Sequence, residues 1–225
     1  MLSLFDQFTP PHTLFTSLMT ISLMFPILIP TPQSRLLADR ITTLMAWCYT
    51  NFLKQVLSPT TKRPCPWMLP TITLIYLLVV INLLGLLPYT FTPSTQLSMD
   101  LGLAIPLWLT TITLGISTRP TTSLGHILPL GTPPPLIPVL IIIETASLLI
   151  RPLALGIRLT ANMTAGHLLL QLVSTATISL YSLMPLAACL TTIMLAVLTL
   201  LELAVALIQA YVFTLLFTLY LEENA

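Results

Sequence analysis

Residues 136–173 read LIPVLIIIETASLLIRPLALGIRLTANMTAGHLLLQLV, a long apolar stretch that nevertheless contains an arginine. A charged side chain at the depth of a bilayer costs roughly 3 kcal/mol or more, so Arg158 must face protein, an opposite charge or water. An arginine keeps its proton inside proteins, so it can attract, block or orient other charges but cannot relay a proton. Arg158 is therefore the first candidate functional residue.

The composition of the whole chain indicates a membrane protein. Of its 225 residues 56% are hydrophobic and only 7% are charged, and the mean hydropathy is +0.96. A soluble domain needs a far more highly charged surface, so this chain has too few polar side chains to coat a globule in water. The net charge of +1 and the lack of a Lys/Arg-rich run also exclude nucleic acid as a partner.

Cysteine and histidine give no sign of a cofactor. The three cysteines are scattered and show no CxxC spacing, which predicts inert thiols rather than a disulfide framework or a zinc site. The three histidines lie in three separate segments, whereas a haem-binding bundle offers paired histidines on facing helices. We therefore expect no cofactor and no bound metal.

The chain before residue 136 divides into shorter segments. The apolar runs over residues 14–30, 68–88 and 97–116 are each of a length to cross a bilayer as an upright helix. Residues 35–57 differ, because apolar side chains recur there at steps of three and four with charged and amide side chains between them. We expect an amphipathic helix on the membrane surface, with packing against a soluble partner helix as the alternative.

Residues 136–173 and 186–221 are too long to stand upright. At 1.5 Å per residue they would form helices of about 57 and 54 Å, against a hydrocarbon core of about 30 Å. An unbroken pair fits only if it lies roughly 60° from the membrane normal, beyond the usual range of spanning helices. We therefore predict an all-α integral membrane protein, a single membrane domain over residues 1–225, with a steeply tilted C-terminal hairpin that turns near residues 174–185.

Lysine and arginine predict the orientation of the chain. One connection carries five of them and the loop after residue 116 carries another, whereas the other two connections carry none: Arg35, Arg40, Lys54, Lys62 and Arg63 in the first, and Arg119 in the second. By the positive-inside rule the basic loops and the C-terminus lie inside, and the N-terminus lies outside.

One stripe of the first long helix carries three charged residues. Glu144, Arg151 and Arg158 lie seven residues apart, so they share a face that drifts only slowly around the helix. Folding the hairpin near its middle places Arg158 beside Gln209 of the second long helix. Arg158 needs an acceptor, yet no carboxylate of this chain is obviously placed to be its permanent partner. We expect the missing counter-ion to belong to another subunit.

The same hairpin brings His167 within one turn of Glu202. This pair lies about 13 Å along the helix from Arg158 and half a turn around it, toward the outer side, whereas Glu144 lies toward the inner side. Histidine and glutamate can relay protons. One titratable cluster on each side of a permanent cation is the pattern expected of two half-channels separated by a barrier.

Several of these residues also have purely structural interpretations. Arg151 can pair with Glu144 as readily as it can take part in transport. His167 can be a buried neutral imidazole, and Glu202 can be a structural carboxyl group. Asp100 is a weaker candidate, because a position at the membrane interface would be enough to explain it.

A row of small residues lies beside Arg158 at helical spacing: Ala154, Ala161 and Ala165. Small side chains let a second helix come close. The row fits either tight packing inside the hairpin or the docking of a partner, and the sequence favours neither.

Short motifs recur along nearly the whole chain and are together very specific. They are NLLGLLP at 82–88, FTP at 91–93, IPLW at 105–108, Gly-Thr-Pro at 131–133, IE at 143–144, RLTANMTAGH at 158–167, and LELAVALIQAYVF at 201–213. With these motifs the chain resembles the subunit a family of the mitochondrial ATP synthases, which form the membrane stator of a rotary motor. The resemblance implies a multi-pass protein of the mitochondrial inner membrane, with its N-terminus toward the intermembrane space and its C-terminus toward the matrix.

The resemblance also implies roles for the candidate residues. In this family an essential arginine, here Arg158, faces a rotating ring of proteolipid subunits that each carry one carboxylate. The family's proton path matches five further residues: Glu144 on the inner side, His167 and Glu202 on the outer side, and Asn162 and Gln209 near the arginine. The implied partners are the ring, other membrane and peripheral-stalk subunits, lipid and protons. The chain alone would be no enzyme and would bind no nucleotide, since it has no P-loop.

Two other functions are still open on the sequence alone. A proton-coupled transporter or antiporter would usually show an inverted repeat and paired broken helices, and we find no repeat. A structural membrane anchor of a respiratory complex would carry its buried charges incidentally. Replacement of Arg158 separates these functions, because only the motor needs that charge for coupled ATP synthesis.

Overall fold

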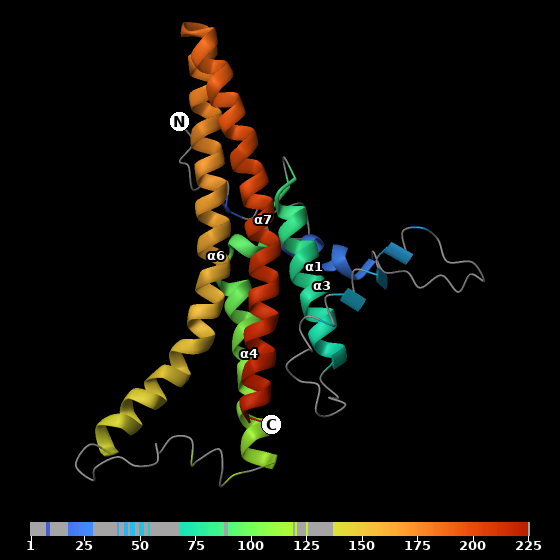
Figure 1. The fold of residues 1–225 in the computed structure, drawn as a ribbon, viewed down its shortest axis with the longest axis vertical. Coiled ribbons are helices and arrows are strands. Elements are labelled where there is room, and N and C mark those ends of the chain that lie inside the picture. Colours follow the sequence, from blue (N-terminus) through green and yellow to red (C-terminus); the bar gives the residue numbers. More distant parts are fainter. Residues whose placement is uncertain are drawn as a thin grey trace. The chain divides into compact units, whose positions relative to one another are not determined.

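The computed structural model describes residues 8–9, 18–28, 40, 43–44, 46–47, 50–51, 54, 68–87, 90–118, 120, 125 and 137–224. Its elements are α1 (Leu18–Leu28), α3 (Met68–Gly85), the short 3₁₀ helix η2 (Pro93–Thr95), α4 (Leu97–Thr118), α6 (Ile137–Leu183) and α7 (Pro185–Asn224) (Figure 1). All regular elements of these residues are helical, and α4, α6 and α7 are long and apolar enough to cross a membrane. The prediction of an all-α membrane protein is confirmed.

The two C-terminal helices are longer than the sequence indicated. α6 has 47 residues and α7 has 40, and Met184 alone separates them. α6 continues through the predicted turn because the hydroxyl groups there bond back to their own helix; those of Thr175 and Ser179, for example, donate to the carbonyls of Leu172 and Ala176, both at 2.9 Å. Hydroxyl side chains satisfied in this way need no turn.

Pro185 begins the second long helix. Proline has no N–H group and its φ angle suits a helix, so it is well placed at the first helical position, where an N–H would lack a partner. The break at Met184 is short, since its N–H donates to the carbonyl of Leu180 at 2.8 Å. The steep tilt of the hairpin stays a prediction.

α3 and α4 follow the predicted spans closely. α3 begins at Met68 as predicted and ends at Gly85, three residues before the end of the predicted span over residues 68–88. α4 begins at Leu97 as predicted and ends at Thr118, two residues beyond the predicted end at residue 116. After α3 the chain turns back past Gly85, where an added Cβ atom would lie only 2.9 Å from Thr92 Cγ2. Glycine is required at this close approach.

The N-terminal segments are described only in part. α1 lies inside the predicted span over residues 14–30 and contains Pro26, and the flanking residues of that span lie outside the described ones. Most of the predicted surface helix, residues 35–57, also lies outside the described residues. That helix stays a prediction.

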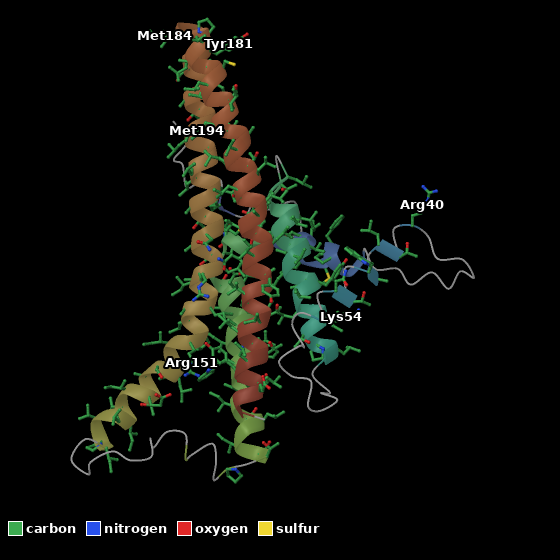
Figure 2. All side chains as sticks on the ribbon, viewed as in Figure 1. Arg40, Lys54, Arg151, Tyr181, Met184 and Met194 are labelled. Carbon is green, nitrogen blue, oxygen red and sulfur yellow. The ribbon has the colours of Figure 1, made fainter. Side chains whose placement is uncertain are left out.

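Residues 1–33, 75–97 and 158–211 form one compact unit. Within it, the facing parts of α6 and α7 run side by side from the turn at Met184 (Figure 1). The side chain of Asn82 in α3 is fully buried and donates to the carbonyl of Ala206 in α7 at 3.3 Å. Tyr181 and Met184 are exposed at the turn, and Met194 is exposed further along α7 (Figure 2).

Residues 34–74, 98–157 and 212–225 form the second compact unit, which contains most of α4, the first part of α6 and the end of α7. α6 approaches α4 closely, since a Cβ atom on Gly156 would lie 2.8 Å from Leu101 Cδ2. On α7 the aromatic rings of Phe213 and Phe217 are buried. This unit carries Glu144, Arg151 and Asp100, whereas the first unit carries the other candidate residues.

Candidate functional site

His167 and Glu202 form a buried pair across the hairpin. His167 Nε2 lies 3.8 Å from Glu202 Oε1, and the two side chains are only 18% and 6% exposed. The adjacency predicted from the hairpin is confirmed. At 3.8 Å the two atoms are at ion-pair distance but too far apart for a direct hydrogen bond.

Gly166 makes room for this pair. A Cβ atom built at Gly166 would lie 2.7 Å from Glu202 Oε1 and 3.0 Å from its Cδ atom. An added Cβ atom would therefore force the carboxyl group of Glu202 to shift, since that group occupies the space that a larger residue on α6 would fill. The glycine directly before His167 therefore allows the carboxyl group of Glu202 to lie close to the imidazole.

Further polar atoms in this unit lack hydrogen-bond partners. Among the described residues, six buried side-chain atoms of the unit have no hydrogen-bond partner: His167 Nε2, both carboxyl oxygens of Glu202, Gln171 Oε1, Asn82 Oδ1 and Ser94 Oγ. Buried polar atoms are almost always satisfied in folded proteins, so unsatisfied ones need an explanation. Bound water is the usual partner of such atoms inside proteins.

Arg158 lies on another face of α6. Its side chain is exposed, whereas the neighbouring Leu159 and Met163 are buried. The small residues Ala161 and Ala165 are exposed beside it, which favours a docking surface over packing inside the hairpin, and Ala154 is exposed as well. Among the described residues Arg158 makes no ion pair within 4.0 Å.

Asn162 and Gln209 are the two polar residues that the sequence predicts near Arg158. Asn162 follows one turn later on α6, and Gln209 lies on α7 in the same compact unit; both side chains are half-buried. The predicted contact between Arg158 and Gln209 stays a prediction.

Arg151 pairs with Glu144, as one interpretation of the sequence predicted. Arg151 Nη2 lies 3.9 Å from Glu144 Oε1. The guanidinium carbon also lies 5.2 Å from the centre of the Tyr220 ring, within the range of a cation–π interaction. Tyr220 lies on α7, so Arg151 (labelled in Figure 2) connects two helices of its unit.

Asp100 is buried against the chain's own residues, and its interfacial position in the membrane stays a prediction. Its side chain lies in the first turn of α4 and is only 4% exposed. A carboxylate is favourable there because the N-terminal end of a helix carries partial positive charge. Its Oδ2 atom has no hydrogen-bond partner among the described residues. None of these observations links Asp100 to His167 or Glu202, which belong to the other unit.

Residues 13–222 match the ATP synthase A chain family. The chain belongs to this family. Among its relatives, the "ATP synthase F(0) complex subunit a" of Struthio camelus and that of Salmo salar are each 57% identical to the chain over 224 residues, and that of Scyliorhinus canicula is 54% identical. In each comparison the match covers 99% of both sequences, so the chain corresponds to the full length of these family members.

Two residues of the site escaped the sequence interpretation. Gln171 lies one turn after His167, and this i, i+4 spacing from a histidine inside an apolar helix was the available signal. Tyr220 lies seven residues after Phe213, on the face of the second long helix that includes Glu202. An aromatic residue at this position is most simply interpreted as part of the apolar core. Asn82 holds α3 to α7 through its hydrogen bond to Ala206, and its Oδ1 atom, which has no hydrogen-bond partner among the described residues, adds to the polar atoms of this unit.

A methyl group added at Gly166 tests whether the close packing of the His167–Glu202 pair matters for proton-driven ATP synthesis. We expect Gly166→Ala to lower the ATP synthesis rate roughly 5-fold, because the methyl displaces the Glu202 carboxyl group and misplacement of reacting groups by about 1 Å is costly. The rate is measured in vesicles containing the complete complex under an imposed proton gradient. Gly102→Ala is the control, since an added Cβ there meets nothing within 4 Å. Equal rates for both variants would refute the importance of this packing.

Proposed function

We propose that the chain is the proton-translocating stator subunit of a rotary ATP synthase. It offers two offset half-channels to the carboxylates of a proteolipid ring, and Arg158 is the electrostatic barrier between them. The observation that carries the proposal is the buried pair of His167 and Glu202, set on a different face of α6 from the exposed Arg158. The chain makes no ATP itself, because phosphorylation takes place in other subunits of the complex.

The polar cluster around His167 and Glu202 supports an outer half-channel. Imidazole and carboxyl groups both take up and release protons, and here they lie 3.8 Å apart inside the helical unit. Gln171 and Asn82 add two oxygen atoms that can accept hydrogen bonds from water in the same unit. Polar groups held together inside an otherwise apolar helical unit are typical of a proton relay across a membrane.

The exposure of Arg158 supports a partner on that face of α6. A guanidinium group in a membrane needs an acceptor, and exposed small residues beside Arg158 allow another helix to come close. In this proposal the acceptor is the carboxylate of a ring subunit. Arg158 keeps that carboxylate ionised as it passes from one half-channel to the other, and Asn162 and Gln209 are polar neighbours of the crossing.

Glu144 is the proposed carboxyl group of the inner half-channel. It lies 14 residues before Arg158 on α6, about 21 Å away along the helix axis. Its side chain is 42% exposed, so water reaches it more readily than it reaches Glu202. It would accept the proton that a ring carboxylate releases after a turn of the ring.

The proposed cycle follows from these positions. A ring carboxylate takes a proton through the outer half-channel, moves through lipid in its neutral form, and gives the proton to the inner half-channel. Each charge that crosses is worth about 2.3 kcal/mol per 100 mV, so several crossings together can drive one phosphorylation. Because Arg158 cannot carry a proton, protons reach the inner side only by way of the ring.

The proposed setting is the mitochondrial inner membrane. The distribution of basic residues favours an N-terminus on the intermembrane-space side and a C-terminus on the matrix side. The proposed partners are the proteolipid ring, other membrane and peripheral-stalk subunits, and the lipid bilayer. A steep tilt of α6 and α7 would bring a long helical face against the ring, with residues 35–57 on the membrane surface.

Cysteine cross-linking tests the proposed ring interface. With Cys48, Cys65 and Cys189 replaced by Ser, Ala161→Cys is expected to form a disulfide with a cysteine placed beside the essential carboxylate of a ring subunit, and oxidation should stop turnover. Ala161 is exposed next to Arg158, whereas Ala210 is fully buried, so Ala210→Cys is the matched control and should not cross-link.

The outcome decides between the proposed functions. A cross-link at Ala161 but not at Ala210, with loss of turnover, supports the stator. No cross-link to the ring from Ala161, or equal cross-linking from both positions, contradicts the ring interface and returns the transporter and the membrane anchor as explanations.

A further inference from the structure

We propose that Tyr220 acts through Arg151 to position Glu144, so that Tyr220 and Arg151 are positioning residues of the inner half-channel. The inference rests on the function proposed above for Glu144. It adds a connection between the end of α7 and the carboxyl group on α6 that would receive protons from the ring.

Arg151 lies between two groups that both attract its charge. Its Nη2 atom is 3.9 Å from Glu144 Oε1, which is ion-pair distance but too long for a hydrogen bond. Its guanidinium carbon is 5.2 Å from the centre of the Tyr220 ring. The carboxylate contact alone would be loose, so the aromatic contact adds a second restraint on where the guanidinium lies.

The contacts join parts of the chain that are far apart in sequence. Glu144 and Arg151 are two helical turns apart on α6, about 10.5 Å along its axis, so only a long side chain can close the gap. Tyr220 is on α7, in the same compact unit. If the ring of Tyr220 fixes the planar guanidinium, then a position on α7 determines where the partner charge of Glu144 lies.

The surroundings restrict the contact between Arg151 and Tyr220. Arg151 and Tyr220 line a small cavity of about 20 Å³, together with apolar and aromatic side chains from three helices, among them Trp108 of α4, Leu155 of α6, and Phe213 and Phe217 of α7. A cavity of this size holds about one water molecule. The walls of this cavity restrict where the Arg151 side chain can lie beside the Tyr220 ring, and through Arg151 a change at Tyr220 should reach Glu144.

Substitutions at Tyr220 test the connection in the complete ATP synthase, reconstituted in vesicles, with synthesis rates normalised to the amount of assembled complex. Tyr220→Leu is expected to lower the rate roughly 3- to 10-fold, whereas Tyr220→Phe, which keeps an aromatic face for the guanidinium, stays within about 2-fold of the unmodified rate. Tyr181→Leu is the matched control and should change nothing, because Tyr181 is exposed at the turn of the hairpin.

A second comparison separates positioning from packing. In a Glu144→Gln background, adding Tyr220→Leu or Arg151→Gln should cause no further loss, because both residues act through the carboxyl group that is already gone. A packing role would lower the rate again in that background. If Tyr220→Leu prevents assembly, Tyr220→Met, which keeps more side-chain volume, replaces it, and Arg151→Gln gives the same comparison without changing α7.

The inference is overturned if Tyr220→Leu behaves like Tyr181→Leu, if Tyr220→Phe is as harmful as Tyr220→Leu, or if the losses multiply in the Glu144→Gln background. Arg158→Ala in the same assay separates this failure from a failure of the proposed function. Unchanged synthesis in Arg158→Ala refutes the stator proposal itself. Lost synthesis in Arg158→Ala with no effect at Tyr220 refutes only the positioning role.

Discussion

We expect ATP synthesis to fall at least about 10-fold when Glu202 is replaced by Gln, because Glu202 is proposed to relay protons and such a side chain contributes a factor of about 100 or more. Gln keeps the size of Glu and an oxygen that accepts hydrogen bonds, but it cannot take up and release a proton there. The side chain of Glu202 is only 6% exposed, so bulk water does not replace it easily. The measurement is the synthesis rate of vesicles containing the complete complex under an imposed proton gradient.

Glu222→Gln is the control for this experiment. Glu222 lies near the end of α7 and is exposed, so its substitution removes the same charge from a position outside the proposed path. We expect its synthesis rate to stay close to that of the unmodified complex. Equal rates in Glu202→Gln and Glu222→Gln would make Glu202 a structural carboxyl group, as one interpretation of the sequence allowed.

Replacement of Arg158 by Ala has the largest expected effect of all substitutions in the chain. Coupled synthesis should fall about 100-fold or more, the loss typical of removing a preorganised charge from a reaction site. The complex should still assemble, because the Arg158 side chain is exposed and its removal leaves no cavity in the helical unit. Arg40→Ala is the control, since Arg40 is an exposed basic residue outside the long hairpin (Figure 2).

The hairpin and its polar pair were predictable from the sequence. Two apolar stretches of nearly equal length, with a short connection between them, leave the chain one simple way to fold back. Once the turn is placed near Leu183, helical rise alone brings His167 to the level of Glu202. The structure has the break at Met184 and the pair at 3.8 Å.

The exact ends of the helices were less predictable. The run of Ser and Thr residues after Val173 indicated a turn, since such residues favour loops, but in an apolar environment their hydroxyls bond to the carbonyl three residues earlier and the helix continues. The end of α3 depends on Thr92, which returns to contact Gly85. Gly85 and Thr92 are seven residues apart, and whether the chain closes such a turn depends on packing as well as on the local sequence.

The partners of the candidate residues were the hardest to predict. The pairing of Arg151 with Glu144 follows from their seven-residue spacing, but the ring of Tyr220 approaches Arg151 only because α6 and α7 pack together in that unit. The small residues beside Arg158 fitted internal packing and a docking surface equally well. The exposure of Ala161 and Ala165 favours the docking surface, a distinction that required the packed hairpin.

Parallel assays of ATP synthesis and passive proton flow in vesicles containing the Arg158→Ala complex test the proposed barrier. We predict a fully assembled complex that no longer synthesises ATP and that leaks protons even when the ring carboxylates are chemically blocked, because the half-channels are then joined. Normal synthesis, or proton flow that still stops when the ring is blocked, would contradict a barrier at Arg158. Loss of assembly with no functional complex would instead identify a structural anchor.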